Sequence, residues 1–377
     1  MNKNQKMRKN WIDNLRWVTV LSVLLYHVIY FFNNKGVFWG LGWFWTFPEY
    51  QQYQDVIMYI LYPWFMPLLF LLAGISARYS LKKYSNKEWF KSRTRKLLVP
   101  STIGLFVFQW MLGYFNTEIS VVAQGLDRSS SLPWIVKYFV YVMSWLGHLW
   151  FIQLLWLLCI ALLLIRKIDY KDKFRKLCRK SNIIIILWLG ILFRLGTKTL
   201  IFDVTHPLAW LYNLYKPFFY LIIFLIGYLV FSHDEVQQKV KKIWIPLLTW
   251  SILSWIILIY TTWGENNSTP QYLSTRLCCI YGWITCLALM GWFNACFDWT
   301  NKFSNYMTHS SYGIYIVHYL IIAALGYMMK MYTQLSPLTI YLILTVAVFT
   351  LSPLLYEILH HIPIIRWCVL WEKALKK

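Results

Sequence analysis

The sequence has 377 residues, of which 59% are hydrophobic, 20% aromatic and only 14% charged, and its formal net charge is +22. A water-soluble domain of this size does not normally have this composition. Apolar runs of about 20 residues, the length that crosses a bilayer, recur along the whole chain. The composition therefore excludes an ordinary soluble domain and predicts a polytopic membrane protein.

Hydropathy predicts an all-α bundle of about ten membrane-spanning helices, forming a single membrane-embedded domain over 1–377. The outer loops are too short for an extramembrane catalytic domain, so any chemistry belongs to the bundle. The aromatic stretch Trp134–Trp145 is either an interfacial helix or part of the fourth span. The expected spans are 14–33, 57–77, 97–115, 143–165, 182–202, 212–231, 243–263, 275–297, 311–330 and 338–359.

Basic residues indicate the orientation, because Lys and Arg accumulate in loops that stay in the cytoplasm. With the N-terminus inside, 28 of the 37 Lys and Arg residues fall in the cytoplasmic pieces, chiefly 78–96 and 166–180. Both termini are therefore expected in the cytoplasm of a multi-pass protein of the inner (cytoplasmic) cell membrane. The same pattern explains the net charge, so nucleic acid is not an expected partner, whereas membrane lipid is.

Cysteine spacing argues against two further classes of site. The seven cysteines have no CxxC spacing, so neither a disulfide framework nor a zinc site is expected. No metal and no tightly bound cofactor are predicted.

The first span carries two ionisable residues, Arg16 and His27, within an otherwise apolar run. Eleven residues turn a helix through about 1100°, within about 20° of three full turns, and rise roughly 16 Å. Both side chains are therefore expected on one face, with Arg16 near the cytoplasmic interface and His27 deeper. Taken singly, Arg16 also fits snorkelling to the headgroups, and His27 fits a neutral interhelical hydrogen bond. Asp13 either pairs with Arg16 or caps the helix.

The chemistry of this pair suggests a reaction site. A neutral histidine in an enclosed site is suited to general-base work because it can take a proton from a hydroxyl near neutral pH. An arginine is suited to binding phosphate or carboxylate groups. One helix thus presents a base and an anion-binding group in line.

Five stretches resemble, in order, the membrane acyltransferase family 3, and the likeness covers nearly the whole chain. They are "DNLRWVTVLSVLLYH", "PWFMPLLFLLAGISARYSLKK", "FKSRTRKLLVP", "GHLWFIQLLWLL" and "SSYGIYIVHYLI". The fourth resembles an element of the glucan succinyltransferase branch. One departure is that Lys96 stands where the family commonly has a second arginine, three residues after Arg93. Arg95 is nearby, so the identity of the second basic group stays open.

The resemblance implies an integral-membrane transferase that moves an acyl group, acetyl or succinyl, from cytoplasmic acyl-coenzyme A to a hydroxyl of an extracytoplasmic glycan. Its catalytic residues would be His27 and Asp13. The phosphates of the donor would be bound by four basic residues, namely Arg16, Arg93, Arg95 and Lys96. The oligomeric state is not predicted.

Several other polar residues fall in or near spans, where they are costly unless paired. His148 and Trp150 open the fourth span, and His148 is either an acceptor-binding or a plain interfacial histidine. His318 lies one turn beyond Tyr315, and an interhelical hydrogen bond is expected for it. Arg194 lies deep in the fifth span and requires a partner or a cavity. Asp203 and His206 are expected on the acceptor side. Glu357 either meets headgroups or pairs with Arg93 or Lys96.

Two other functional classes remain open at this stage. A transporter or flippase for a glycan or lipid-linked precursor would use Arg16 and His27 to bind and release its substrate. A proton-coupled carrier would use His27 and His318 as relays. An acyltransferase is the leading hypothesis because it explains the base and the cations together.

Overall fold

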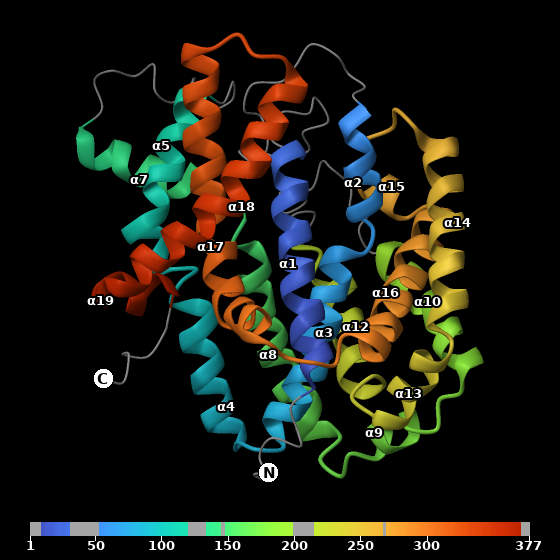
Figure 1. The fold of residues 1–377 in the computed structure, drawn as a ribbon. Helices are drawn as coiled ribbons and strands as arrows, with labels where there is room; N and C mark the ends of the chain where they lie inside the picture. Colours follow the sequence, from blue (N-terminus) through green and yellow to red (C-terminus); the bar gives the residue numbers. More distant parts are fainter. Residues whose placement is uncertain are drawn as a thin grey trace. The chain divides into compact units, whose positions relative to one another are not determined.

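The computed structural model describes residues 9–30, 53–119, 133–144, 148–198, 215–266 and 269–370, and Figure 1 labels its helices. Helices make up most of these residues, and no strand occurs among them. The α-helices are α1 Asn10–Tyr30, α2 Val56–Leu61, α3 Phe65–Leu81, α4 Asn86–Arg93, α5 Trp110–Ile119, α7 Trp134–Ser144, α8 Trp150–Ile168, α9 Lys173–Cys178, α10 Ile183–Lys198, α12 Pro217–Leu229, α13 Asp234–Lys242, α14 Trp244–Thr262, α15 Pro270–Leu273, α16 Arg276–Cys296, α17 Lys302–Tyr332, α18 Pro337–His361 and α19 Pro363–Ile365. The short η segments are η2 Tyr53–Asp55, η3 Thr94–Leu98, η4 Leu105–Gln109 and η5 Arg366–Leu370.

The described residues contain seven helices long and apolar enough to cross a membrane, or eight if the bent pair α12 and α13 counts as one span. The seven coincide with seven of the expected spans, so a helical multi-pass membrane protein is confirmed. Within the described residues, the helices of the other three expected spans, 97–115, 182–202 and 212–231, are shorter or broken. Helix α10 has 16 residues, and α12 has 13 before a bend of 100° leads into α13.

Pro100 explains why the expected span 97–115 is not one helix. The π-helical segment η3 ends just before it, and a second π-helical segment, η4, precedes α5. Proline offers no N–H to the carbonyl four residues earlier, which is that of Lys96. That carbonyl accepts a hydrogen bond from the Tyr312 hydroxyl at 2.6 Å instead. The carbonyl of Ser101 is likewise satisfied by the side chain of Gln153 at 3.1 Å.

The chain forms two compact units. Unit 1 comprises Met1–Thr19, Tyr59–Lys91 and Leu157–Thr308, and unit 2 comprises Val20–Met58, Ser92–Trp156 and His309–Lys377. Within unit 1, α16 packs against α10, α13 and α14, and α3 packs against α12. Within unit 2, α5 packs against α7. Residues 134–144, expected as an interfacial helix or as part of the fourth span, thus form the separate short helix α7.

Helices α3 and α12 of unit 1 approach closely through glycine. A Cβ on Gly74 would lie 2.1 Å from the carbonyl oxygen of Phe224, and a Cβ on Gly227 would lie 2.2 Å from that of Leu71. Small residues allow membrane helices to bring their backbones together, where dispersion replaces the missing hydrophobic driving force. The two glycines therefore set the distance between α3 and α12.

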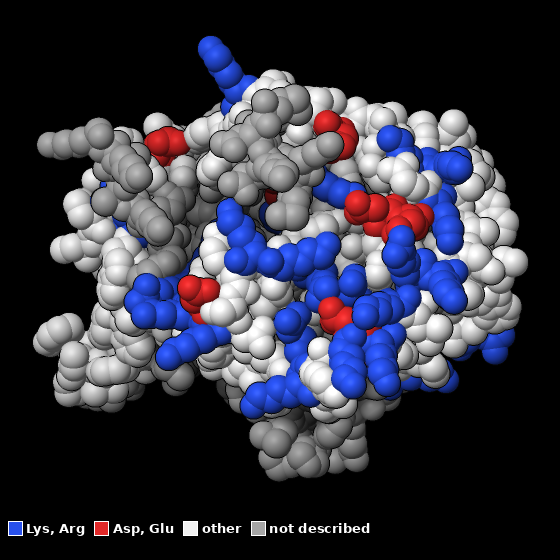
Figure 2. Space-filling view, turned by 90° about the horizontal axis from the view of Figure 1, so that it is seen from below, with Lys and Arg blue, Asp and Glu red and all other residues white. Residues whose placement is uncertain are grey.

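The basic loops of unit 1 lie together. Lys9 Nζ donates to Asp234 Oδ1 at 2.7 Å, and Lys239 Nζ donates to the Ser181 carbonyl at 2.7 Å. Figure 2 shows that Lys and Arg side chains crowd one face, where Asp and Glu are few. The exposed basic residues of these loops are Lys82, Lys83, Lys87, Lys91, Lys167, Lys171, Lys173, Lys176, Arg179, Lys180 and Lys242. Three loops expected in the cytoplasm thus share a face, as a common orientation requires.

Other helices present apolar side chains outward. Only 22% of the most apolar window of α14 and 28% of that of α18 is buried. Trp250, Ile256 and Val346 are 65%, 51% and 64% exposed. Such extensive apolar exposure in contiguous helices is typical of a surface in contact with lipid.

Substitution of Gly74 by Ala is expected to destabilise unit 1. The added methyl group would overlap the Phe224 backbone, and overpacking of this kind costs about 1–3 kcal/mol. Gly104→Ala is the matched control, because a Cβ there meets its nearest atom, the Cys368 oxygen, at 3.2 Å. Thermal unfolding of the protein in detergent should show a clear drop for Gly74→Ala and a smaller one for Gly104→Ala. Equal drops would contradict the assigned α3–α12 contact.

Cysteine labelling tests the predicted orientation. In a variant without native cysteines, Lys176→Cys in α9 should react with a membrane-impermeant maleimide only after spheroplasts are permeabilised. Gln271→Cys in α15, exposed and in an expected outer loop, should react in intact spheroplasts. The reverse pattern would place the basic face of unit 1 outside.

Candidate functional site

Unit 2 gathers three histidines and two tyrosines around one face of α17. His27 lies in the last turn of α1, His148 directly precedes α8, and His318 belongs to α17. Tyr315 lies one turn before His318 in α17, Tyr319 directly follows His318, and the two tyrosines are four residues apart at helical spacing. The side chains of His148 and His318 are buried, at 2% and 0% exposure, whereas His27 is half-buried.

A chain of hydrogen bonds determines which nitrogen of each ring carries a proton. His318 Nδ1 lies 2.6 Å from the carbonyl oxygen of Tyr315, and a carbonyl only accepts, so this nitrogen donates. In the neutral ring, Nε2 of His318 is then an acceptor, and it lies 2.9 Å from His27 Nδ1. His27 Nδ1 therefore donates. Among the described residues no carboxylate contacts either ring, and a buried ring with no anionic partner is neutral.

This assignment leaves the lone pair of neutral His27 on Nε2. Across the described part of the chain, Nε2 of His27 has no hydrogen-bond partner. If Nε2 took a proton, the positive charge on the ring would be stabilised through the Nδ1–H bond to His318, because hydrogen bonds to charged groups are the stronger ones. The arrangement can therefore abstract a proton at one defined atom.

His148 completes this histidine cluster from the side of α8. Its Nε2 donates to the Ile316 carbonyl at 3.1 Å, and its own carbonyl accepts a hydrogen bond from the Tyr315 hydroxyl. The ring of Tyr319 stacks on His148, with centroids 4.7 Å apart, and meets His27 edge to face at 4.5 Å. His148 is thus held on both sides, and its burial suits positioning of the cluster better than direct contact with a substrate.

The basic residues expected near the entry of the third span lie around η3. Arg93 ends α4, and Arg95 and Lys96 belong to the π-helical η3. Besides the hydrogen bond from Tyr312 to its carbonyl, Lys96 has its ammonium group 5.3 Å from the centre of the Tyr312 ring. Tyr312 therefore orients Lys96.

Unit 1 contains the predicted partner of Arg16. Arg16 Nη1 donates to Asp13 Oδ1 at 2.9 Å, so the i,i+3 pairing is the one present. Arg16 Nη2 also donates to Ser76 Oγ in α3 at 2.7 Å. The guanidinium group is thus fixed by two neighbours. Its side chain is 36% exposed, so it remains accessible to a ligand.

The other predicted site residues are more dispersed. Arg194 in α10 is half-buried, and its Nε has no hydrogen-bond partner among the described residues. Trp150 begins α8, and its ring contacts that of Phe151 at 6.4 Å. Glu357 lies in α18, and its expected contact with headgroups or with Arg93 or Lys96 stays a prediction. Asp203 and His206 lie outside the described residues.

Sequence reasoning missed three contributors to these contacts, namely Ser76, Tyr312 and Tyr319. Tyr312 and Tyr319 fall at i−3 and i+4 from Tyr315, so helical spacing places all three on one face. That spacing was available in the sequence. The sequence did not show that Tyr312 contacts η3 or that Ser76 contacts α1, because these partners are far apart along the chain. Among the described residues, no three His, Cys, Asp or Glu side chains converge as metal ligands.

The chain is similar over most of its length to one family of known proteins. The model of acyltransferase family 3, described as an acyltransferase domain, matches residues 9–357. No curated protein and no solved structure matches the chain. The match includes both units and the histidine cluster, and it agrees with the membrane-spanning helices. The chain therefore belongs to acyltransferase family 3, and the protein is a multi-pass membrane acyltransferase.

Proposed function

We propose that the protein is an O-acyltransferase that moves an acetyl or succinyl group from cytoplasmic acyl-coenzyme A to a hydroxyl of an extracytoplasmic glycan. The observation that carries this proposal is the directed chain from His27 to His318 to the Tyr315 carbonyl, which leaves a basic nitrogen on a half-buried ring. The family supplies the class of reaction. The succinyl alternative rests on the resemblance of "GHLWF" to the glucan succinyltransferase branch.

In the proposed reaction His27 acts as the general base. Its Nε2 takes the proton of the acceptor hydroxyl while the oxygen attacks the thioester carbonyl. The carbon–sulfur bond breaks, and the thiolate leaves with the proton from His27, so an ester and free coenzyme A result. His318 is a positioning residue, because its acceptor nitrogen holds the imidazolium that forms in between.

Cationic residues are proposed to bind the phosphates of the donor. Arg93 at the end of α4 and Arg95 and Lys96 in η3 lie within four consecutive residues, and arginine and lysine both recognise phosphate. Lys96, fixed by Tyr312, is the proposed counterpart of the family's second arginine. Arg16 keeps the donor role that the resemblance implies, with Asp13 as the residue that orients it.

The acceptor side is proposed to include Trp150 and Arg194. The face of a half-buried tryptophan can stack on a sugar ring, and an arginine with an unpaired Nε can donate to a sugar oxygen or carboxylate. Asp203 and His206 keep the same proposed role. His148 supports the base through Tyr315 and Tyr319.

Replacement of His27 by Ala should abolish acyl incorporation, because it removes Nε2, the proposed basic nitrogen. Protein level and glycan export should be unchanged. His361→Ala, an exposed histidine in the last turn of α18, is the control and should retain activity. Mass spectrometry of envelope glycans would detect the missing ester. Loss of export with acylation preserved would favour the transporter.

Replacement of His318 should change turnover more than donor binding. His318→Leu removes the acceptor for His27 Nδ1–H, and a hydrogen bond to a charged group is worth about 1.5–3 kcal/mol, so kcat should fall by roughly 10- to 100-fold. The KM for the acyl donor should change little. His318→Gln should recover part of the loss, because the side-chain oxygen of glutamine reaches towards the position of His318 Nε2. Equal activity of the Leu and Gln variants would exclude the positioning role.

A further inference from the structure

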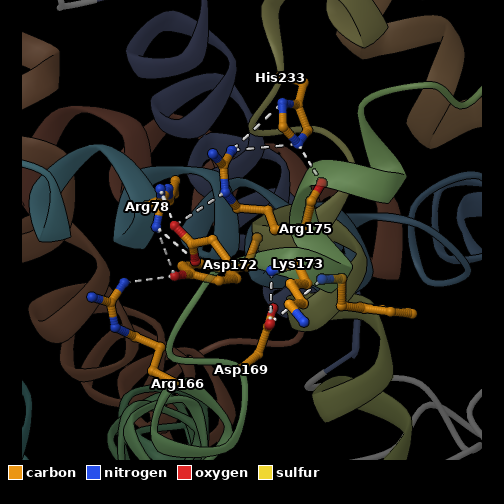
Figure 3. Close-up of polar contacts among 9 residues, drawn as sticks. Arg78, Arg166, Asp169, Asp172, Lys173, Arg175 and His233 are labelled. Carbon is orange, nitrogen blue, oxygen red and sulfur yellow. Dashed lines mark hydrogen bonds and ion pairs between the residues drawn. The ribbon is translucent and has the colours of Figure 1, made fainter.

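Unit 1 contains a second polar cluster that the proposed acyl transfer does not use. It lies where α3, α8 and α12 end, and Figure 3 shows its side chains converging. Arg78 Nη2 donates to Asp172 Oδ2 at 2.8 Å, and Arg78 Nη1 donates to the Tyr228 hydroxyl at 3.2 Å. Arg166 Nη1 donates to the same hydroxyl at 2.8 Å. Arg175 Nε lies 3.7 Å from Asp172 Oδ2.

The charges of this cluster do not balance. Three guanidinium groups surround one carboxylate, and Arg166 contacts no carboxylate among the described residues. His233 donates from Nε2 to the Arg175 carbonyl at 2.9 Å, and burial lowers the pKa of His233, so its ring is neutral at pH 7. Burial and the nearby Arg78 cation lower the pKa of Arg175, as expected for uncompensated positive charge.

Hydrogen-bond donors are also left over. The Nε atoms of Arg78, Arg166 and Arg175 are buried without a hydrogen-bond partner in the described chain. The Tyr228 hydroxyl accepts from two arginines, and no described group accepts its own proton. Carbonyl dipoles at the three helix ends offset part of the charge, but they leave these N–H and O–H groups unsatisfied. The cluster therefore has donors in excess and lacks an acceptor.

Backbone geometry at Asp172 supports an arranged site. Asp172 has a φ of 54°, in the left-handed region that a residue other than glycine seldom adopts. Such a conformation costs about 1–3 kcal/mol and persists where its surroundings enforce it. Asp172 also accepts from Arg78 through both carboxylate oxygens, at 3.4 and 2.8 Å. A purely structural ion-pair network would need more carboxylates than the one present.

We propose that Arg166 and Tyr228, with Arg78 and Arg175, bind a phosphate group. Its several acceptor oxygens would take the leftover N–H and O–H donors, and its negative charge would balance the excess arginines. The phosphate would belong to a lipid headgroup or to a soluble phosphate ester, since the cluster adjoins the basic face of unit 1. The site is independent of the histidine cluster in unit 2.

Thermal unfolding in phosphate and in chloride at equal ionic strength tests the site with inorganic phosphate as the probe. A ligand that binds only the folded protein raises its unfolding temperature. The wild-type protein in detergent should be stabilised more by phosphate than by chloride. Arg166→Gln should weaken the apparent phosphate affinity at least tenfold. Arg179→Gln is the matched control, since Arg179 is 62% exposed on the same loop and pairs with Glu235. An equal phosphate effect in wild type and Arg166→Gln, or none in wild type, would overturn the proposal.

Asp172→Asn distinguishes a phosphate-binding role of the cluster from a purely structural role, because the two roles predict different changes in the effect of phosphate on the unfolding temperature. Removal of Asp172, the one carboxylate that pairs with these arginines among the described residues, should strengthen phosphate binding at least threefold, even if the variant unfolds at a lower temperature in chloride. A purely structural network would lose stability in both salts by the same amount, which would contradict the site.

Nanodiscs distinguish the two sources of phosphate. The same measurement is made in phosphatidylcholine discs with and without phosphatidylglycerol. A phosphate effect that disappears in the anionic lipid supports a headgroup in the site, and one that persists there supports a soluble phosphate ester. Absence of a phosphate effect in both kinds of disc would count against the site.

Discussion

The hydrogen bond from His318 Nδ1 to the Tyr315 carbonyl is the interaction on which the histidine cluster depends. A backbone carbonyl cannot donate, so this single contact determines the tautomer of His318 and, through it, that of His27. The basic nitrogen of His27 is thereby Nε2. Tyr315 has a second role, because its hydroxyl holds the carbonyl of His148. One helical turn of α17 therefore organises residues from α1 and from the start of α8.

The two units satisfy polar groups among apolar helices in different ways. In unit 2 the buried rings are neutral and are paired with carbonyls, which avoids the desolvation of charge. In unit 1 the cluster around Asp172 contains charged groups at the ends of helices, where a membrane protein meets water and headgroups. A neutral site suits proton transfer within a bundle, whereas an unbalanced cationic site suits an anion from outside it.

A single proline explains why the predicted span 97–115 is not one continuous helix. Pro100 interrupts the hydrophobic stretch of residues 97–115, and the freed carbonyl of Lys96 is used by Tyr312. A hydropathy window averages over such a residue and reports a continuous span. The interruption also has a structural consequence, since it lets Lys96 of η3 contact Tyr312 of α17 within unit 2. The same proline that breaks the helix thus contributes to the proposed donor site.

Hydrophobic length and motif order were sufficient to predict a helical multi-pass membrane protein and its family, and i,i+3 spacing gave the pairing of Asp13 with Arg16 as one of two alternatives. These features are local, because hydropathy and i,i+3 spacing act within one segment. His27 and His318 were both recognisable as polar residues in spans, but 291 positions separate them, and only packing of α1 against α17 made them partners. The cluster of Arg78, Arg166 and Arg175 gave no sequence signal beyond a basic loop. Arg78 and Arg175 meet Asp172, and Arg78 and Arg166 meet Tyr228, because separate helices end at the same place, and tertiary structure alone decides where helices end relative to one another.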